Sequence, residues 1–160
     1  MVKIVKGERA GKNGKLTVGC SAAVFDENHE RILLIRRADN GKWAVPGGYM
    51  EAGENFSEAC VREVYEETGL QVEVNRLISI YTHPHILLEY PDGNRWQLVV
   101  LHFEVSMLDG KLKPSNESLE LDFYTLAETE TLEMGVLDRL RVVDSFAKQE
   151  AAFVRNEFGL

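Results

Sequence analysis

The stretch from Gly48 to Leu70, GYMEAGENFSEACVREVYEETGL, constrains the fold most, because it encodes one short helix with defined ends. Asn55 is followed three residues later by Glu58, the pattern of an N-cap residue and its partner in a capping box. Gly69 stands where a helix commonly ends in a left-handed residue. The spacing predicts a helix from about Phe56 to Thr68.

The predicted helix carries acidic residues beside its apolar face. At about 100° per residue, the apolar face contains Phe56, Cys60, Val61, Val64 and Thr68. Glu67 falls within this sector, Glu63 at its edge and Glu66 one step further round. Three carboxylates therefore share an arc that is partly turned towards the protein.

Such a cluster needs a cation. Like charges one turn apart repel, and a carboxylate withdrawn from water is costly unless it is paired. Arg62 is placed to brace the acids by charge-assisted hydrogen bonds. Oxygen-only ligands favour a hard divalent ion such as Mg²⁺. Judged from spacing alone, a solvated acidic face without metal stays open as the alternative.

The fixed positions of this stretch resemble the Nudix box. The matching residues, at the box spacings, are Gly48, Glu54, Arg62-Glu63-Val64, Glu66-Glu67 and Gly69-Leu70. The resemblance covers the box fully and the rest of the chain loosely. It implies an α+β fold, the Nudix-type α/β/α sandwich with a mixed, mainly hairpin-built sheet, formed by residues 1–160 as a single domain.

The resemblance also implies an activity: Mg²⁺-dependent hydrolysis, with Mn²⁺ as a substitute, of the pyrophosphate bond in a nucleoside diphosphate linked to another group. Nucleoside triphosphates and ADP-ribose-like compounds are both candidate substrates, and the choice between them stays open. The alternative from another class is a non-catalytic, nucleotide-sensing Nudix-like binding module. Substitutions at the acidic positions of the box would favour that alternative, and no box acid is missing here.

Roles for the box residues follow from the same resemblance. Glu66 and Glu67 are expected to bind the metal directly. Glu63 is expected to be a third ligand or the base that orients water. Arg62 and Glu54 are expected to orient these acids.

Three further positions are candidates for the metal site. Family members often complete the metal shell with a backbone carbonyl, which here belongs to Gly47 or its neighbour. Many also bring one more acid from a loop after the central strands. Glu117 and Glu120 stand in that part of the chain, and the resemblance does not choose between them.

Substrate-binding candidates lie outside the box. Arg36 and Arg37 end a predicted strand, and an Arg pair beside an acidic site suits a substrate phosphate, although a solvated strand end is the alternative. Aromatic rings can stack on a nucleobase, although each can equally be a core residue. The candidates are Trp43, Tyr81, Tyr90 and Trp96.

Hydrophobic alternation and turn residues predict the remaining elements. Strands are expected at 16–25, 31–36, 71–81, 86–90, 95–105 and 119–125. The first two are expected to form one hairpin, and the strands flanking Pro91-Asp92-Gly93-Asn94 a second, with 95–105 central in the sheet. A turn region is expected over 107–114 and a long amphipathic helix over about 132–157. Residues 1–15 are expected to be loosely ordered or to pack at an edge.

Composition limits the partners. With a net charge of -8 over 160 residues and no basic cluster, neither general nucleic-acid binding nor binding to an anionic membrane is expected. A small-molecule nucleotide would be met through metal ions and a few local arginines. Monomer and homodimer are both open.

Cysteine and histidine usage indicates ordinary packing roles. Cys20 and Cys60 stand in apolar contexts without metal-type spacing, so we expect two core thiols. The absence of an 18-residue apolar span and of a signal peptide adds to the expectation of a reduced, cytoplasmic setting. His83 and His85 are expected at a loop or rim, and His102 inside the central strand as a core or pocket histidine.

Overall fold

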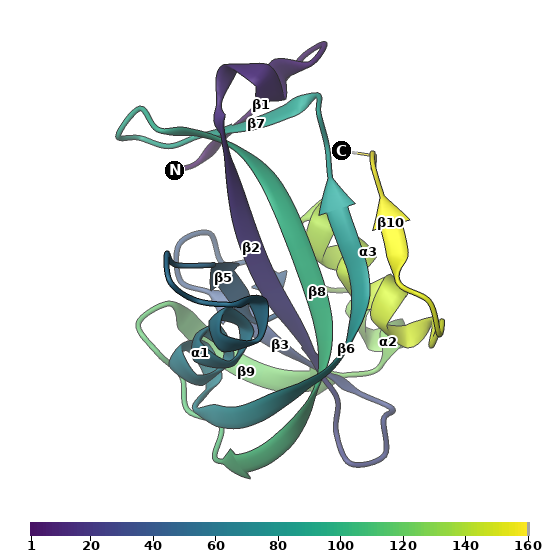
Figure 1. Cartoon of the computed structure of the whole chain (residues 1–160). Helices are drawn as coiled ribbons and strands as arrows, with labels where there is room; N and C mark the ends of the chain where they lie inside the picture. Colours follow the sequence, from purple (N-terminus) through teal and green to yellow (C-terminus); the bar gives the residue numbers. More distant parts are fainter. Residues whose placement is uncertain (160) are drawn as a thin grey trace.

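A mixed sheet forms the centre of the molecule, with helix α1 on one face and helix α3 on the other (Figure 1). The computed structural model describes residues 1–159, and within them the sheet has seven strands. These are β1 (Lys3–Lys6), β2 (Lys15–Val24), β5 (Gly47–Tyr49), β6 (Leu70–Thr82), β7 (Ile86–Glu89), β8 (Arg95–Gly110) and β10 (Phe153–Arg155). This arrangement confirms the predicted mixed α/β/α architecture.

The order of the central sheet is β1-β7-β8-β2-β5, with β6 also paired to β8 and β10 paired to β6. A second, three-stranded sheet has the order β4-β3-β9. It comprises β3 (Ile32–Arg37), β4 (Trp43–Ala44) and β9 (Ser118–Tyr124). The helices are α1 (Phe56–Thr68), α2 (Leu126–Thr129) and α3 (Val136–Phe146), with a 3₁₀ turn η1 (Ala10–Asn13).

Two hydrophobic clusters form the core. One lies between α1 and the sheet and includes Cys60, Val64 and Phe103. The other includes Ile32, Ile78 and Val142, the last of which is on α3. Because both faces of the sheet are covered, its central strands are apolar along most of their length.

Helix α1 has the predicted bounds. The Asn55–Glu58 capping box is present, and Gly69 ends the helix with φ of 77°. One part of the predicted apolar face is wrong, because Phe56 is 46% exposed. Packing against the sheet begins one turn later, at Ala59 and Cys60.

The expected hairpin of the strands at 16–25 and 31–36 is wrong. Strand β2 pairs in parallel with β8 over ten residues, whereas β3 enters the second sheet. A single antiparallel bridge, Phe25 with Ile32, joins the two segments. The last six residues of β2 and the first four of β3 are buried, so their composition does not reveal their partners.

The second hairpin is confirmed, with Leu88 opposite Trp96 in the β7–β8 pair, and β8 is central as expected. The turn predicted over 107–114 is partly wrong, because β8 continues to Gly110. Pairing with the start of β6, where Leu70 lies opposite Gly110, extends it.

The long C-terminal helix is also wrong. Helix α3 ends at Phe146, Lys148 has φ of 51°, and β10 then pairs in parallel with β6. Arg155 of β10 donates a 2.6 Å hydrogen bond to Asp144 Oδ1 of α3. This interaction joins two separate elements, so helical periodicity in the sequence does not predict it. At the other end of the chain, β1 pairs with β7, so residues 3–6 pack at the sheet edge.

Candidate active site

Arg62 of α1 binds the acidic residues that precede and surround it. Its Nε donates to Glu54 Oε1 at 2.5 Å, its Nη1 to Glu63 Oε1 at 2.8 Å and its Nη2 to the main-chain oxygen of Tyr49 at 2.9 Å. Nη1 also lies 3.3 Å from Glu66 Oε2. The guanidinium hydrogen bonds hold the pKa of Glu54 below its usual range. One cation therefore fixes the loop before α1 to the acidic side of the helix.

Glu67 is a buried carboxylate at the centre of the site. It is 7% exposed, and its Oε2 accepts a 2.9 Å hydrogen bond from the amide of Gly47. Burial is the main cause that raises its pKa, to about 8, and the negative charges of Glu63 and Glu117 add to the effect. The Gly47 amide and the charge of Arg37 act in the opposite direction.

Glu63 lies against the glycine turn that precedes α1. Burial raises its pKa, the Arg62 guanidinium lowers it, and nearby Glu66 and Glu117 raise it again. A Cβ on Gly48 would collide with the Glu63 carboxyl group. Glycine at this position is therefore what allows the carboxylate to lie so close to the strand.

The loop before β9 brings Glu117, rather than Glu120, to the acidic residues. Ser118 Oγ donates 2.8 Å to the main-chain oxygen of Glu67, which fixes the loop to the end of α1. The charge of Glu117 acts on both Glu63 and Glu67. Glu120 is instead paired with Arg36 across β3 and β9, at 3.3 Å between exposed side chains.

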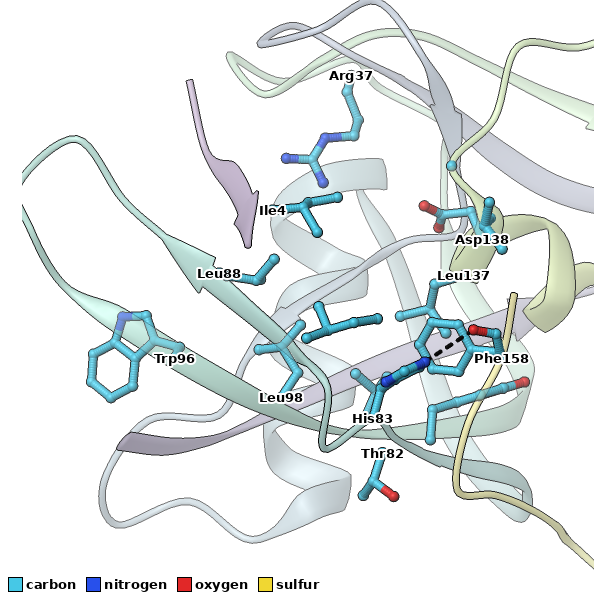
Figure 2. A pocket seen from close by; sticks show the side chains of 15 residues that line it. Ile4, Arg37, Thr82, His83, Leu88, Trp96, Leu98, Leu137, Asp138 and Phe158 are labelled. Carbon is cyan, nitrogen blue, oxygen red and sulfur yellow. Dashed lines mark hydrogen bonds between the residues drawn. The ribbon is translucent and has the colours of Figure 1, made fainter. Parts of the chain in front are cut away.

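Of the two arginines at the end of β3, Arg37 faces the site. It makes two hydrogen bonds to Asp39, of 2.9 and 2.7 Å, and lines a cavity of about 270 Å³ (Figure 2). Figure 2 shows Arg37 and Asp138 near one end of this cavity. Arg36 donates to the main-chain oxygen of Gly41 and to Glu120, away from the cavity lining.

The cavity beside Arg37 is mainly apolar and lies between the sheet, the start of α3 and the C-terminal segment. Its lining includes Ile4, Leu98, Leu137 and Phe158. His83 also lines it, and its Nε2 lies 3.1 Å from the main-chain oxygen of Phe158 (Figure 2). Arg37, whose charge acts on Glu67, is the lining residue that relates this cavity to the acidic cluster.

Two of the predicted stacking residues are packed within the protein. The Trp43 ring lies edge-on to Tyr124, with centroids 5.1 Å apart, and does not line the cavity. Tyr81 is 1% exposed, and its hydroxyl donates 2.7 Å to Asp144. Tyr81 and Trp96 both line the cavity, but Tyr81 is almost fully covered, whereas Trp96 is partly exposed.

Sequence reasoning missed two residues that line cavities here. Asp138 lies on the first turn of α3 and accepts hydrogen bonds from Val45 N and from Arg141. Asp138 stands in the segment predicted as a long amphipathic helix, and that pattern gives no sign of a role in a cavity. Tyr49 follows Gly48 within the box, and an aromatic residue at that position was the available signal in the sequence. In the structure its side chain is 40% exposed.

The residues present fit a divalent cation. The candidate donors are all oxygens. Arg62 binds Glu63 and Glu66, and the charge of Arg37 acts on Glu67, so the acids Glu63, Glu66, Glu67 and Glu117 outnumber the neighbouring arginines. A hard ion offsets this excess of negative charge. Across residues 1–159, no three acidic, His or Cys side chains are already spaced as a complete ligand set, since Arg62 draws Glu63 and Glu66 towards itself.

No helix in the described part of the chain is both long and apolar enough to cross a membrane.

Comparison with known proteins identifies the family. The NUDIX domain family model matches residues 15–146. An ADP-ribose pyrophosphatase of Methanocaldococcus jannaschii is 37% identical over 129 residues, which are 78% of this chain and 72% of the relative. A MutT-like protein of Streptomyces ambofaciens is 33% identical over 124 residues, 78% of this chain and 73% of the relative.

Solved structures share the fold. A NUDIX hydrolase from Nitrosomonas europaea superposes with a TM-score of 0.69 at 27% identity, covering 89% of this chain and 80% of that one. An ADP-ribose pyrophosphatase from Streptococcus suis has a TM-score of 0.67 at 22% identity, covering 88% and 98%. The chain therefore belongs to the Nudix hydrolases, enzymes that act on small nucleotide substrates and generally use a divalent metal.

Proposed function

We propose that this Nudix enzyme uses Glu63, Glu66 and Glu67 to hold Mg²⁺, with Mn²⁺ as a substitute, and cleaves the pyrophosphate bond of a nucleoside diphosphate linked to another group. The observation that carries this proposal is the buried carboxylate of Glu67, fixed by the Gly47 amide and surrounded by further acids. A carboxylate withdrawn from water without a cation of its own costs stability. Such a cost is typical of functional sites.

The ligand set is assigned from this arrangement. Glu66 and Glu67 would bind the ion directly, Glu63 would be a third ligand or the base, and Glu117 is the further acid. The Gly47 main chain lies against Glu67 and would offer its carbonyl. When bound, the ion neutralises charge on phosphate oxygens and lowers the pKa of a coordinated water.

The chain's own residues position the acids. Arg62 holds Oε1 of Glu63, so as the base Glu63 would accept a proton from the attacking water on its other oxygen, Oε2. Glu54 accepts two hydrogen bonds from the same guanidinium and fixes its plane. Arg37 adds positive charge near Glu67, where it would stabilise negative charge on the substrate.

Substrate choice rests on the shape of the site and on the relatives. A net charge of -8 favours a small nucleotide over nucleic acid or an anionic membrane. The ADP-ribose pyrophosphatase relative supports a nucleoside diphosphate linked to another group, and a nucleoside triphosphate is the second candidate. Two free, buried cysteines support a cytoplasmic setting, for a monomer or a homodimer.

The test is turnover of a substrate panel with and without Mg²⁺, comparing the parent with Glu67→Gln. The panel contains ADP-ribose, a UDP-sugar, nucleoside triphosphates, oxidised guanine nucleotides, dinucleoside polyphosphates and RNA with a capped or triphosphorylated end. The amide of glutamine keeps an oxygen for the Gly47 bond, so the fold should persist while turnover falls by roughly two to four orders of magnitude. Glu73→Gln, an exposed position on β6, is the matched control and should match the parent.

Full turnover by a folded Glu67→Gln variant would show that the site is assigned wrongly. If the parent binds a nucleotide yet releases no product from any substrate at any Mg²⁺ or Mn²⁺ concentration, the chain is instead a nucleotide-sensing module.

A further inference from the structure

A second cavity, of about 320 Å³, lies beside the one that Arg37 lines. Its lining consists of Thr17, Tyr49, Tyr90, Asp92 and Trp96. Trp96 lines both cavities, and Figure 2 shows it at the end of the first one opposite His83 and Phe158. Three of the five lining residues of the second cavity are aromatic, which distinguishes it from its mainly aliphatic neighbour.

The sheet register explains why side chains from distant segments meet here. Thr17 of β2 lies opposite Leu98 of β8, and Trp96 is two residues before Leu98, so all three share one face. Tyr49 of β5 lies opposite Gly19, two residues after Thr17, and shares that face as well. Strand register therefore places Thr17, Tyr49 and Trp96, whereas Tyr90 and Asp92 come from the turn between β7 and β8.

Two of the rings are held together at the rim. Tyr49 and Tyr90 have ring centroids 6.4 Å apart at 60°, and their hydroxyl groups are hydrogen-bonded. Tyr49 is 40% exposed, and Tyr90 and Trp96 are partly exposed. In the cavity that Arg37 lines, by contrast, the Phe158 ring already packs edge-on against His83, with ring centroids 5.0 Å apart.

The aromatic cavity and the acidic cluster lie on opposite faces of β5, the strand at the edge of the sheet. Gly48 of this strand lies against Glu63, whereas the ring of the next residue, Tyr49, lines the aromatic cavity. The charge of Arg37 acts on both Tyr49 and Glu67, so a substrate that passes the edge strand beside Arg37 would join the two sites.

We propose that Tyr49, Tyr90 and Trp96 form a subsite on which the nucleobase of the substrate stacks. The inference rests on the proposed function, because it places the base relative to a diphosphate at the acidic cluster. Aromatic rings bind the face of any base, and the lining offers three. Asp92 at the rim, fixed by 2.9 and 2.7 Å hydrogen bonds from Asn94, is an acceptor for a base amino group. Bases that carry an exocyclic amino group should therefore bind better than hypoxanthine or uracil.

Kinetics of Tyr90→Leu and Trp96→Leu test the subsite. KM for a nucleotide substrate should rise roughly tenfold while kcat stays within about twofold, because stacking binds the part of the substrate that does not react. Tyr90→Phe keeps the ring and should restore the parent KM. Tyr65→Leu removes an aromatic ring that is 56% exposed on α1 and should leave KM unchanged. The compound 5-phosphoribosyl diphosphate has no base, so its KM should stay close to the parent value in all four variants.

A binding measurement gives a readout independent of turnover. In a Trp43→Phe background, Trp96 is the only tryptophan, and its fluorescence should be quenched by AMP and not by ribose 5-phosphate. Tyr90→Leu should weaken the AMP response roughly tenfold. If the parent binds AMP in this way but hydrolyses nothing, the proposed function fails while the subsite stands.

The subsite is overturned by two results. One is an unchanged KM and AMP response in both leucine variants. The other is a KM increase caused by Leu137→Ala in the cavity that Arg37 lines and not by Tyr90→Leu, which would place the base beside Arg37 instead.

Discussion

The main-chain amide of Gly47 donates a 2.9 Å hydrogen bond to Oε2 of Glu67, a residue twenty positions later at the other end of α1. This bond joins the glycine turn of β5 to the last turn of the helix. It fixes the buried carboxylate against the backbone that is proposed to share its metal ion. The neighbouring glycines therefore control the position of two different acids.

Replacing the two glycines by alanine should separate stability from activity. A Cβ on Gly47 would meet the main chain of Cys20 and Ser21, so Gly47→Ala should lower the free energy of unfolding by about 1–3 kcal/mol. A Cβ on Gly48 would meet the movable end of Glu63, so Gly48→Ala should cost less stability but lower turnover at least roughly tenfold. Urea unfolding and steady-state kinetics measure the two effects. Gly7→Ala, whose new Cβ would lie 4.0 Å from the Cβ of Ala10, is the control, and equal effects of the two box substitutions would contradict this assignment.

Arg62→Lys should impair the enzyme although the charge is kept. The guanidinium donates to Glu54, Glu63 and the Tyr49 carbonyl at once, which a single ammonium group cannot reproduce. We expect turnover to fall roughly 10- to 100-fold with little change in thermal stability. Arg95→Lys, at an exposed pair with Glu89, is the matched control. Parent-like turnover in Arg62→Lys would show that the geometry of the guanidinium does not position the acids.

Acid should destabilise the protein through His102. The ring is buried, with Nε2 2.8 Å from Ser145 Oγ and Nδ1 2.8 Å from Ser21 Oγ. Ser145 Oγ donates its proton to the Arg141 carbonyl, so it accepts from the ring, which is therefore neutral with its proton on Nε2. Burial, and then the charge of Arg141, lower the pKa of His102 well below its ordinary value.

Because the unfolded chain binds this proton more readily, the contribution of His102 is present above about pH 6.5 and is lost as the pH falls below it. The expected slope is up to about 1.4 kcal/mol per pH unit. Denaturant unfolding between pH 5 and 7 should show this loss of stability in the parent but not in His102→Gln. His29→Asn, at an exposed turn position, is the control and should behave like the parent. The same pH dependence in all three proteins would assign it to another group.

The two cysteines should be unreactive in the folded protein. Burial is the main cause that raises the pKa of Cys20 to about 11 and that of Cys60 to about 12, and each residue is 1% exposed. The reactive thiolate is therefore scarce and shielded at pH 8. Reaction with a disulfide reagent should be slow in buffer and should release two equivalents in guanidinium. Leu16→Cys, at a 69% exposed position, should add one fast equivalent, and fast labelling of the unchanged chain would refute the prediction.

The sequence by itself determined the local part of the site. The capping box and Gly69 define α1 through hydrogen bonds between residues at most four apart, so the helix and the spacing of its acids were predictable. The buried thiols and the β7–β8 hairpin follow from equally local patterns of hydrophobicity and turn residues.

Only the tertiary structure decided which distant residues join that helix. Glu117 reaches the acids because Ser118 bonds to the Glu67 carbonyl, whereas Glu120, three residues away from Glu117, pairs with Arg36. Strand β2 pairs with β8 rather than β3, and β10 replaces the end of the expected helix, because partners far apart in sequence form these contacts. Tyr49 meets Trp96 for the same reason: sheet register is set by long-range pairing, which single-segment periodicity does not encode.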